Sequence, residues 1–375
     1  MTVTMTSSMR RVGAICWKSW STPSPVCQNI SRWRHSLEPM RTERSGGPIV
    51  RYRDLLLTHM LGATCVVWSV ALTPAEAQGQ LEIPSVDVAR GRLGPAAYPR
   101  MAMDPQGGTI QFDAPPERIV SLHANTDEYL YGVVPPERIV GVSSSAYDEE
   151  FSRLPELIAP YDPGIATDAA SILALEPDLV IGTLSSSPEV VFELQTAGIP
   201  VFRLDTLVTR LDQVAENITV LGYITGRDEL ARQARERFEG EIADIAIQCA
   251  APHPEVRIFG HSMTGFSYGD QTLFHDVVRL IGGINVAAEG GLHTYERIER
   301  EDVMAWNPEW VFTWALPGEE SEELQRWMED PHLGLTSAAR REHIVVSDGR
   351  DTRRLSPFIT TRARTMADAV CAAGG

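Results

Sequence analysis

Basic residues are scarce in this sequence, and lysine is almost absent from it. The 375 residues include 33 lysines and arginines against 50 aspartates and glutamates, a formal net charge of −17, and Lys18 is the only lysine. A protein that binds nucleic acid needs a surplus of basic side chains to neutralise phosphates. We therefore expect no nucleic acid among the partners of this chain.

Cysteine is scarce too. Of the five cysteines, Cys16, Cys27 and Cys65 lie in the first 77 residues, which leaves Cys249 and Cys371. No Cys-x-x-Cys pair or cysteine–histidine cluster indicates a zinc site. Two cysteines in an exported protein predict either one disulfide or two buried free thiols, and the sequence leaves both open.

Motifs of nucleotide binding are also missing. The chain has no G-x-x-x-x-G-K-[ST] sequence, and no G-x-G-x-x-G follows a predicted strand. The pairs Gly282-Gly283 and Gly290-Gly291 indicate turns. Phosphate-loop and dinucleotide chemistry are therefore excluded.

The first apolar run of the chain predicts an export signal. In RYRDLLLTHMLGATCVVWSVALTPAEAQ (51–78), two arginines precede an apolar core, and Ala75-Glu76-Ala77 matches an A-x-A cleavage site. A membrane anchor is the alternative, because the apolar run approaches spanning length. The small residues at the site favour a cleaved signal peptide over residues 51–77, and hence a periplasmic protein.

Two more N-terminal segments are predicted to lie outside the fold. Residues 1–50 precede the signal without any periodicity, and we interpret them as a disordered leader or a misassigned start. Residues 78–107 are rich in proline, glycine and arginine, which predicts a linker. Residues 1–77 hold nine basic and four acidic residues, so the part after the signal keeps 24 against 46, a net charge of −22.

Short apolar runs predict two sets of strands. Most are four to five residues long, β-branched and not alternating, which is typical of strands covered on both faces of a parallel sheet. Helical patterns separate them, so each half is predicted to be an α/β sandwich. The first set, within 108–205, comprises Ile119–Leu122, Arg138–Val142, Asp178–Gly182 and Pro200–Leu204; the second, within 251–375, comprises Val256–Phe259, Trp310–Trp314 and His343–Ser347.

A repeated hexapeptide marks the first two predicted strands. PPERIV occurs at 115–120 and again at 135–140. A third copy is absent, which excludes a solenoid, and the fourteen residues between the copies are about the minimum for a crossover between parallel strands. We therefore predict two parallel strands, joined through a short helix at Tyr129–Val133.

The longest helical signal lies between the two halves, within residues 206–250. A first helix runs from Leu211 and is expected to end near Gly226. A second, from Asp228 to Cys249, carries an apolar stripe at helical spacing and would be roughly 33 Å long. Such a helix predicts a stiff connection between the two lobes.

Several motifs in order and spacing resemble one family. They are APPERIVSL (114–122), ASILALEPDLVIG (170–182), LQTAGIPVFRLD (194–205), ITVLGYITGRDELA (218–231), LIGGINVA (280–287), EDVMAWNPEWVF (301–312) and LSP (355–357). From about Gly107 onward the chain resembles the periplasmic solute-binding proteins of the iron-chelate and vitamin B12 class, which serve ABC importers.

The resemblance implies a fold and a function. The expected fold is α/β, with two Rossmann-like lobes bridged by one long α-helix, that of a class III periplasmic binding protein. The expected function is capture of a metal chelate (cobalamin, haem or a ferric siderophore) in the cleft between the lobes, and its delivery to the permease of an ABC importer. It also implies a monomer that is not an enzyme and has no cofactor of its own.

Candidate ligand contacts follow the predicted strands, because ligands of open α/β sheets lie beyond the carboxyl ends of the strands. The residues that this rule selects are rich in aromatic rings and hydroxyls, which suits a large, partly apolar ligand. Two of them are histidines, whose imidazoles could ligate the metal of a haem or a corrinoid. The set is His123, Asn125, Ser145, Tyr147, Ser185, His261, Met263, Phe266, Tyr268 and Trp314.

The resemblance adds residues at the cleft. Tyr295 falls where vitamin B12-binding relatives place a cleft tryptophan, and Phe266 where they place a phenylalanine, whereas their first-lobe tryptophan has no counterpart in 159–168. Arg354 follows Arg353 near the place where siderophore- and haem-binding members carry an arginine. A guanidinium suits catecholate, hydroxamate or propionate oxygens.

Docking on the permease is expected through one acidic residue on each lobe. Glu301 stands at the position of the second-lobe glutamate of the family. At the first-lobe position this chain has Ala170, so Asp168 or Glu149 is the expected substitute. Such pairs steer association more than they hold it.

Two features of the sequence suggest other functions. RIFGHSMTG (257–265) resembles the nucleophile elbow of an α/β-hydrolase with Ser262 as nucleophile, although the G-x-S-x-G pattern is broken at Thr264. A free metal-ion-binding protein of the same fold would draw its ligands from His123, His261 and His293.

Overall fold

The computed structural model describes residues 93–148, 152, 167–250, 255–262, 264–352 and 354–372. The predicted leader, the predicted signal peptide, Glu149, Met263 and Arg353 lie outside the described residues. Within them, no helix is both long and apolar enough to cross a bilayer.

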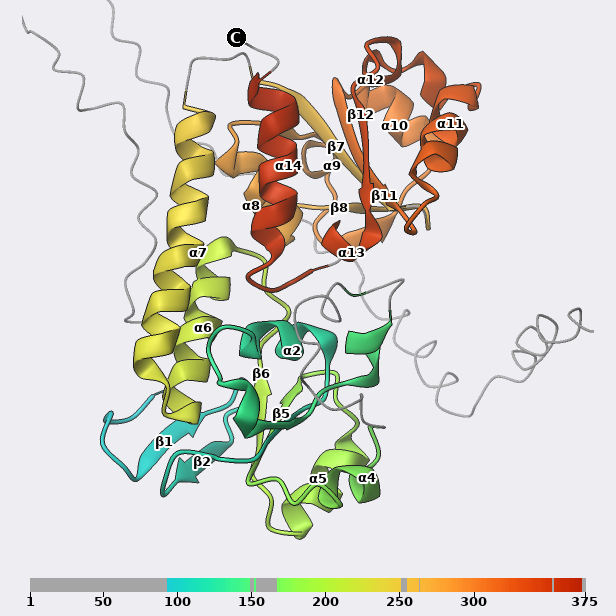
Figure 1. Cartoon of the computed structure of the whole chain (residues 1–375). Coiled ribbons are helices and arrows are strands. Elements are labelled where there is room, and N and C mark those ends of the chain that lie inside the picture. Colours follow the sequence, from blue (N-terminus) through green and yellow to red (C-terminus); the bar gives the residue numbers. More distant parts are fainter. Residues whose placement is uncertain are drawn as a thin grey trace, which may run out of the picture. The chain divides into compact units, whose positions relative to one another are not determined.

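A four-stranded parallel sheet forms the first lobe (Figure 1). Its strands are β3 (Ile119–Ser121), β4 (Ile139–Gly141), β5 (Leu179–Thr183) and β6 (Val201–Leu204), in the order β4-β3-β5-β6. Ile119 of the first PPERIV pairs with Ile139 of the second. The repeat therefore builds two adjacent parallel strands, as predicted.

Helices cover both faces of this sheet because neither face of its strands is polar. One face packs on α4 (Ala169–Leu173) and α5 (Pro188–Thr196) through Ile172 and Leu194. The other packs on α2 (Ala124–Leu130) and on the helices that follow the lobe. The prediction of a helix at Tyr129–Val133 was wrong in its position: α2 begins at Ala124, where His123 caps it. Short 3₁₀ turns at Pro136–Arg138 and Ser144–Tyr147 flank β4.

The predicted linker ends in a folded hairpin, which corrects that prediction. β1 (Arg100–Met103) pairs antiparallel with β2 (Thr109–Phe112). Arg100 fixes the hairpin to the helices, because its guanidinium donates to the carbonyl of Tyr223 at 2.7 Å and to the carboxylate of Asp228 at 2.7 and 3.1 Å. Local sequence gave no sign of this long-range anchor.

The second lobe contains a six-stranded sheet. Its parallel part comprises the three predicted strands, now seen as β7 (Arg257–Ser262), β11 (Trp310–Ala315) and β12 (Ile344–Asp348). The short strand β9 (Ile284–Asn285) also pairs parallel to β7. Two further strands that the sequence did not predict, β8 (Phe266–Tyr268) and β10 (Tyr295–Arg297), extend the sheet antiparallel beyond β7.

Helices also cover both faces of the second sheet. Ile258 and Phe312 face α8 (Leu273–Leu280) and α14 (Ile359–Ala372), whereas Phe259 and Val311 face the opposite layer. That layer contains α10 (Arg300–Trp306), α11 (Glu320–Glu329) and α12 (Ser337–Arg340). The remaining short helices are α9 (Val286–Glu289), the 3₁₀ turn Leu333–Leu335 and α13 (Gly349–Thr352).

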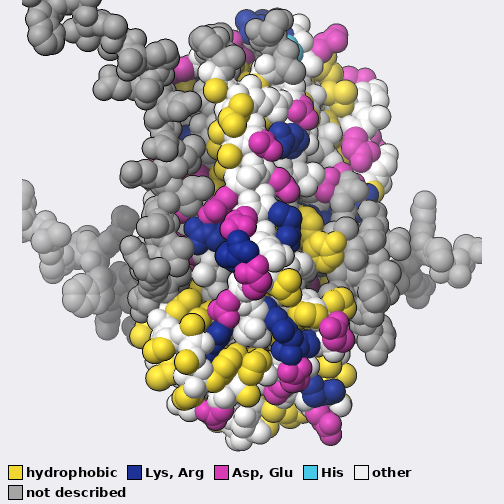
Figure 2. Space-filling view, turned by 60° about the vertical axis from the view of Figure 1, so that its left-hand side comes forward, with side chains coloured by type: hydrophobic (Ala, Val, Ile, Leu, Met, Phe, Trp, Pro, Cys, Tyr) yellow, Lys and Arg dark blue, Asp and Glu magenta, His cyan; other side chains and the backbone are white. Residues whose placement is uncertain are grey.

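Two long helices follow the first lobe. α6 (Leu211–Thr225) ends at Gly226 in the left-handed conformation, with φ of 68°, and α7 (Asp228–Gln248) has 21 residues, both close to prediction. They pack tightly because Gly222 lacks a side chain: a Cβ there would lie 2.2 Å from that of Ala231. Along the outer side of α7, acidic and basic side chains lie next to one another (Figure 2), and Glu229–Arg232 and Arg235–Glu239 are ion pairs.

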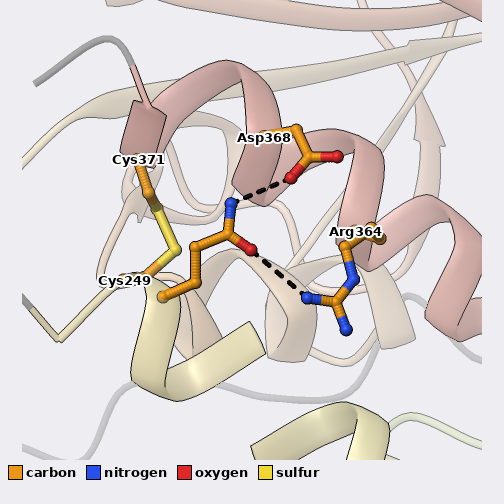
Figure 3. Close-up of a disulfide and its surroundings, with 5 residues drawn as sticks. Cys249, Arg364, Asp368 and Cys371 are labelled. Atoms are coloured by element: carbon orange, nitrogen blue, oxygen red, sulfur yellow. Dashed lines mark hydrogen bonds between the residues drawn. A yellow bond between two sulfur atoms is a disulfide. The ribbon is translucent and has the colours of Figure 1, made fainter. Parts of the chain in front are cut away.

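A disulfide joins α7 to the last helix, α14, and resolves the question that the sequence left open. Cys249, directly after α7, is bonded to Cys371 in α14 across 122 positions of sequence. Gln248 reinforces the junction, because its amide donates to Asp368 at 2.8 Å and accepts from Arg364 at 3.3 Å (Figure 3). The covalent link therefore fixes the end of the connecting helix to the second lobe.

Candidate functional site

A pocket of about 490 Å³ lies at the carboxyl end of the second-lobe sheet. The segment after β6 forms one wall, β8, β10, β11 and the start of α8 form another, and the chain from Arg354 to Arg362 completes it. The residues that line it are Leu207, Val208, Thr209, Tyr268, Gln271, Thr272, Leu273, Phe274, Tyr295, Trp314, Arg354, Leu355, Ile359 and Arg362.

Aromatic rings form one wall of this pocket because β8 and β10 pair antiparallel, with Tyr295 opposite Tyr268. The rings of Tyr268 and Tyr295 have centroids 5.4 Å apart. Phe266, also in β8, stacks on Tyr295 at 4.9 Å. Tyr295 is 48% exposed. An exposed aromatic surface of this kind favours stacking with a large, flat or partly apolar ligand.

Two arginines also line this pocket. The guanidinium of Arg362 stands 4.9 Å from the ring centroid of Tyr268 and 4.7 Å from that of Phe274. Arg354 is 5% exposed and forms an ion pair with Glu128 of α2, in the first lobe. Ser356 donates its hydroxyl to the same carboxylate. Burial raises the pKa of Glu128 to about 7, although Arg354 acts to lower it.

The first-lobe candidates lie after their strands, as predicted, but they are not among the described residues that line the pocket. His123 is used locally, because its Nδ1 accepts from the backbone N–H of Asn125 at 3.1 Å and so caps α2. Burial lowers the pKa of His123. The hydroxyl of Ser145 contacts that of Ser143 at 2.8 Å, and Tyr147 packs against the core.

The third strand of the first lobe ends in a similar loop. The hydroxyl of Ser185 lies 2.7 Å from that of Thr183, and Ser185 itself is exposed. Behind these loops, the buried carboxylate of Asp127 accepts from the hydroxyl of Ser143 at 2.6 Å. Burial raises its pKa to about 7. The loops are therefore held in place by their own hydrogen bonds.

His261 lies in a different cavity, which corrects its grouping with Tyr268. Successive residues of a strand point to opposite faces, and His261 shares the face of Phe259, under α10 and α11. Its ring lies 5.3 Å from that of Trp327, and it lines a cavity of about 270 Å³. Burial lowers its pKa to about 4. His123 is not among the described residues that line this cavity.

Of the expected docking residues, two are described, and both are exposed. Glu301 lies in the first turn of α10, on the second lobe. Asp168 caps α4 on the first lobe, and its carboxylate accepts from the backbone N–H of Ser171 at 2.9 Å. That hydrogen bond lowers the pKa of Asp168.

The hydrolase alternative conflicts with the surroundings of Ser262. Its side chain is completely buried, and its hydroxyl lies 2.7 Å from that of Thr264. The strand that carries it continues into the β8 hairpin, not into a helix as a nucleophile elbow requires. His343 stacks on Trp310 at the start of β12, whereas Ser262 ends β7. No catalytic triad is therefore assembled from these residues.

The free-metal alternative also lacks a site in the described part of the chain. There, no three histidine, cysteine, aspartate or glutamate side chains come together as a metal cluster. His293 lies next to Asp270, with its Nδ1 3.2 Å from the nearer carboxylate oxygen, and its backbone N–H donates to Glu296 at 3.0 Å.

Several lining residues were missed by the sequence analysis. Residues 207–209 follow the predicted strand Pro200–Leu204, but no candidate was chosen after that strand. Residues 271–274 follow no predicted strand, and Arg362 lies within an ordinary helical pattern. Glu128 was not predicted as a functional residue, because the predicted helix began one residue after it, at Tyr129. The two PPERIV copies, which bracket α2, were the only available signal.

Comparison with known proteins gives a consistent result. The family profile described as "Periplasmic binding protein" matches residues 119–350. The cobalamin-binding protein of Halobacterium salinarum is 25% identical over 257 residues, which cover 67% of this chain and 68% of that protein. The vitamin B12-binding protein of Yersinia pestis (strain Pestoides F) is 32% identical over 197 residues, 52% of this chain and 68% of that protein.

Solved structures show the same fold. A periplasmic haem-binding protein from Roseiflexus sp. RS-1, in its apo form, superposes with a TM-score of 0.58 at 24% identity, over 69% of this chain and 99% of that chain. The periplasmic vitamin B12-binding protein of Vibrio cholerae does so with a TM-score of 0.54 at 21% identity, over 68% and 96%. These matches confirm the expected α/β fold with two parallel-sheet lobes.

Proposed function

Because this chain belongs to the periplasmic binding protein family, whose members are binding proteins and not enzymes, we propose that it captures a metal chelate and delivers it to an ABC importer. The cargo classes are cobalamin, haem and ferric siderophores. Relatives with the names cobalamin-binding, vitamin B12-binding and haem-binding protein support this range.

The observation that carries the proposal is the aromatic wall of the pocket. Tyr268, Tyr295 and Trp314 line the pocket with their rings, and Tyr295 is half exposed. Phe266 does not line the pocket itself but stacks on Tyr295. A corrin, a porphyrin and a catecholate each have faces that stack on such rings. Arg354 and Arg362, which also line the pocket, would supply hydrogen-bond donors for oxygen groups at the ligand's edge.

A chelate fits better than a free ion. The Nδ1 of His123 is engaged in a cap, and His261 lines another cavity. The pocket wall itself has no histidine or cysteine among its described residues. The ligand would therefore bring its metal already coordinated.

Delivery would use the acidic side chains on the two lobes. Glu301 and Asp168 are exposed on the second and first lobe respectively, as pairing with arginines of a permease would require. The protein would work as a monomer in the periplasm after cleavage of the predicted signal peptide.

The visible absorption spectrum of the protein purified from its own host tests the proposal. A corrinoid, a haem and a ferric siderophore have distinct bands, so co-purified cargo would be identified directly. Protein that carries no such band, and that binds none of the three classes when they are added at micromolar concentration, would contradict the proposed function.

A further inference from the structure

The arginine in the pocket wall is held by a carboxylate from the other end of the chain. Nη1 of Arg354 donates to Oε1 of Glu128, and Ser356 donates to Oε2. Nε of Arg354 donates to the backbone carbonyl of Arg350. Arg354 and Glu128 are 5% and 4% exposed. The pair is therefore out of water and connects α2 of the first lobe with the pocket wall of the second.

One nitrogen of this guanidinium takes no part in these contacts. Among the described residues, Nη2 of Arg354 is buried and has no hydrogen-bond partner, while Arg354 lines the pocket. A buried donor without a partner is costly. Because Nη2 is closed off from solvent in this structure, an oxygen atom of a bound ligand would satisfy it only once the side chains over it move apart on binding.

The carboxylate of Glu128 changes which oxygen atom is suitable. A lone buried arginine would bind anions much more tightly than uncharged groups. Above pH 7, where Glu128 is ionised, its carboxylate neutralises the guanidinium and repels a second carboxylate close by. What remains at Nη2 is a hydrogen-bond donor with little net charge around it.

We propose that Glu128 is a positioning residue that sets the charge preference of the pocket, so that Arg354 receives uncharged oxygen acceptors of the cargo, such as amide carbonyls. The inference rests on the proposed function, which it makes more specific. Removing the charge of Glu128 while keeping its shape would convert the same pocket into one that selects carboxylates.

Other charged groups near Glu128 are identifiable. Asp351, in α13, raises its pKa, and Arg354 lowers it. Asp127 precedes it in α2, with its carboxylate bonded to Ser143 instead. From α7, Arg237 and Glu241 line a cavity that Glu128 also lines. Of these, Arg354 alone contacts both Glu128 and the candidate ligand pocket.

The test uses chelates that differ in carboxylate charge. Three matched pairs cover the cargo classes: haem and its dimethyl ester, a cobalamin monocarboxylic acid and cyanocobalamin, and a tricarboxylate ferrichrome and ferrichrome itself. The affinity ratio of acid to uncharged form is measured at pH 8, where Glu128 is ionised, for the unmodified protein and for Glu128→Gln. Glu241→Gln, an exposed residue on α7, is the control with the same change in net charge.

We expect the unmodified protein to bind both forms of a pair within about tenfold. Glu128→Gln should raise the ratio in favour of the acid by roughly tenfold to a hundredfold, as for unit charges several ångströms apart at an effective dielectric constant of about 20. Glu241→Gln should leave the ratio unchanged. Equal losses for both forms in Glu128→Gln would indicate a merely structural role and overturn the inference.

A second measurement uses the unmodified protein alone, so it does not depend on whether a variant folds. Lowering the pH from 8 to 6 protonates Glu128 while the ligand carboxylates stay charged, so the acid form should gain affinity over the uncharged form. A ratio that does not change with pH would contradict the inference. Binding of none of the six probes would instead overturn the proposed function, and the inference with it.

Discussion

The ring of Tyr295 stacks on the ring of Phe266, with centroids 4.9 Å apart and an interplanar angle of 15°. The two residues are 29 positions apart in sequence and lie on the paired strands β8 and β10. Tyr295 remains 48% exposed at the pocket. A half-exposed ring held flat by its neighbour costs little ordering entropy on binding. This arrangement suits a stacking surface for cargo.

Tyr295→Ala should therefore weaken binding without unfolding the protein. We expect the affinity for the cognate chelate to fall by at least about tenfold, since one aromatic pair contributes roughly 0.5–1.5 kcal/mol beyond the area it buries. Isothermal titration measures the affinity, and thermal denaturation the stability. Tyr131→Ala, which removes an exposed ring that contacts Phe358 and does not line the ligand pocket, should leave binding intact. Equal losses in the two variants would contradict a role of Tyr295 in binding.

Loss of the disulfide should destabilise the fold. The bond between Cys249 and Cys371 closes a loop of 122 residues, for which a native disulfide contributes about 2–5 kcal/mol. Cys249→Ser, Cys371→Ser and the double variant should all lose a similar amount in urea denaturation. A loss of free energy of unfolding in the double variant twice that in either single variant would contradict this prediction, because each cysteine would then stabilise the fold independently of the other.

Asp127→Asn should change how stability depends on pH. Burial raises the pKa of Asp127 to about 7, so the folded chain keeps a proton that the unfolded chain releases near pH 4. Its contribution to the free energy of unfolding is thus present at low pH and declines by up to about 1.4 kcal/mol per pH unit as the pH rises towards 7.

The measurement is a difference between the two proteins, because His261, with its pKa near 4, acts in the opposite direction. Relative to the unmodified chain, Asp127→Asn should gain stability steadily from pH 4.5 to 7.5. A constant difference across this range would show that Asp127 is ionised throughout.

Glu301→Arg should separate transport from binding. The side chain is exposed on α10 and does not line the pocket, so reversal of its charge should reduce uptake of the chelate by whole cells while the affinity in solution is unchanged. Glu193→Arg, equally exposed on α5 of the first lobe, is the charge-matched control. Normal uptake with Glu301→Arg would contradict a docking role.

The parallel strands were predictable because their signal is local. The Ile-Val of each PPERIV copy is apolar on both faces, and such runs fit strands buried between helices. β8 and β10 were not, because three-residue strands depend on pairing between Tyr268 and Tyr295, far apart in sequence. The β1–β2 hairpin was missed for the same reason, since Arg100 anchors it to Asp228.

The site was predictable only in part. The rule of strand ends found Tyr268 and Trp314, but it could not tell the face of β7 on which His261 lies, since a shift of one residue reverses every side chain of a strand. Glu128 was missed because its role depends on Arg354, 226 positions away. Contacts between the lobes are not encoded in any local pattern.

Calorimetric titration of the purified chain with cyanocobalamin, haem and a ferric siderophore, in parallel with Tyr295→Ala, shows directly whether the pocket beneath Tyr295 holds a metal chelate. One of the three classes should bind with micromolar or tighter affinity and one-to-one stoichiometry, and Tyr295→Ala should weaken its binding at least about tenfold. Absence of binding by all three, or binding that Tyr295→Ala leaves unchanged, would contradict a chelate site in this pocket.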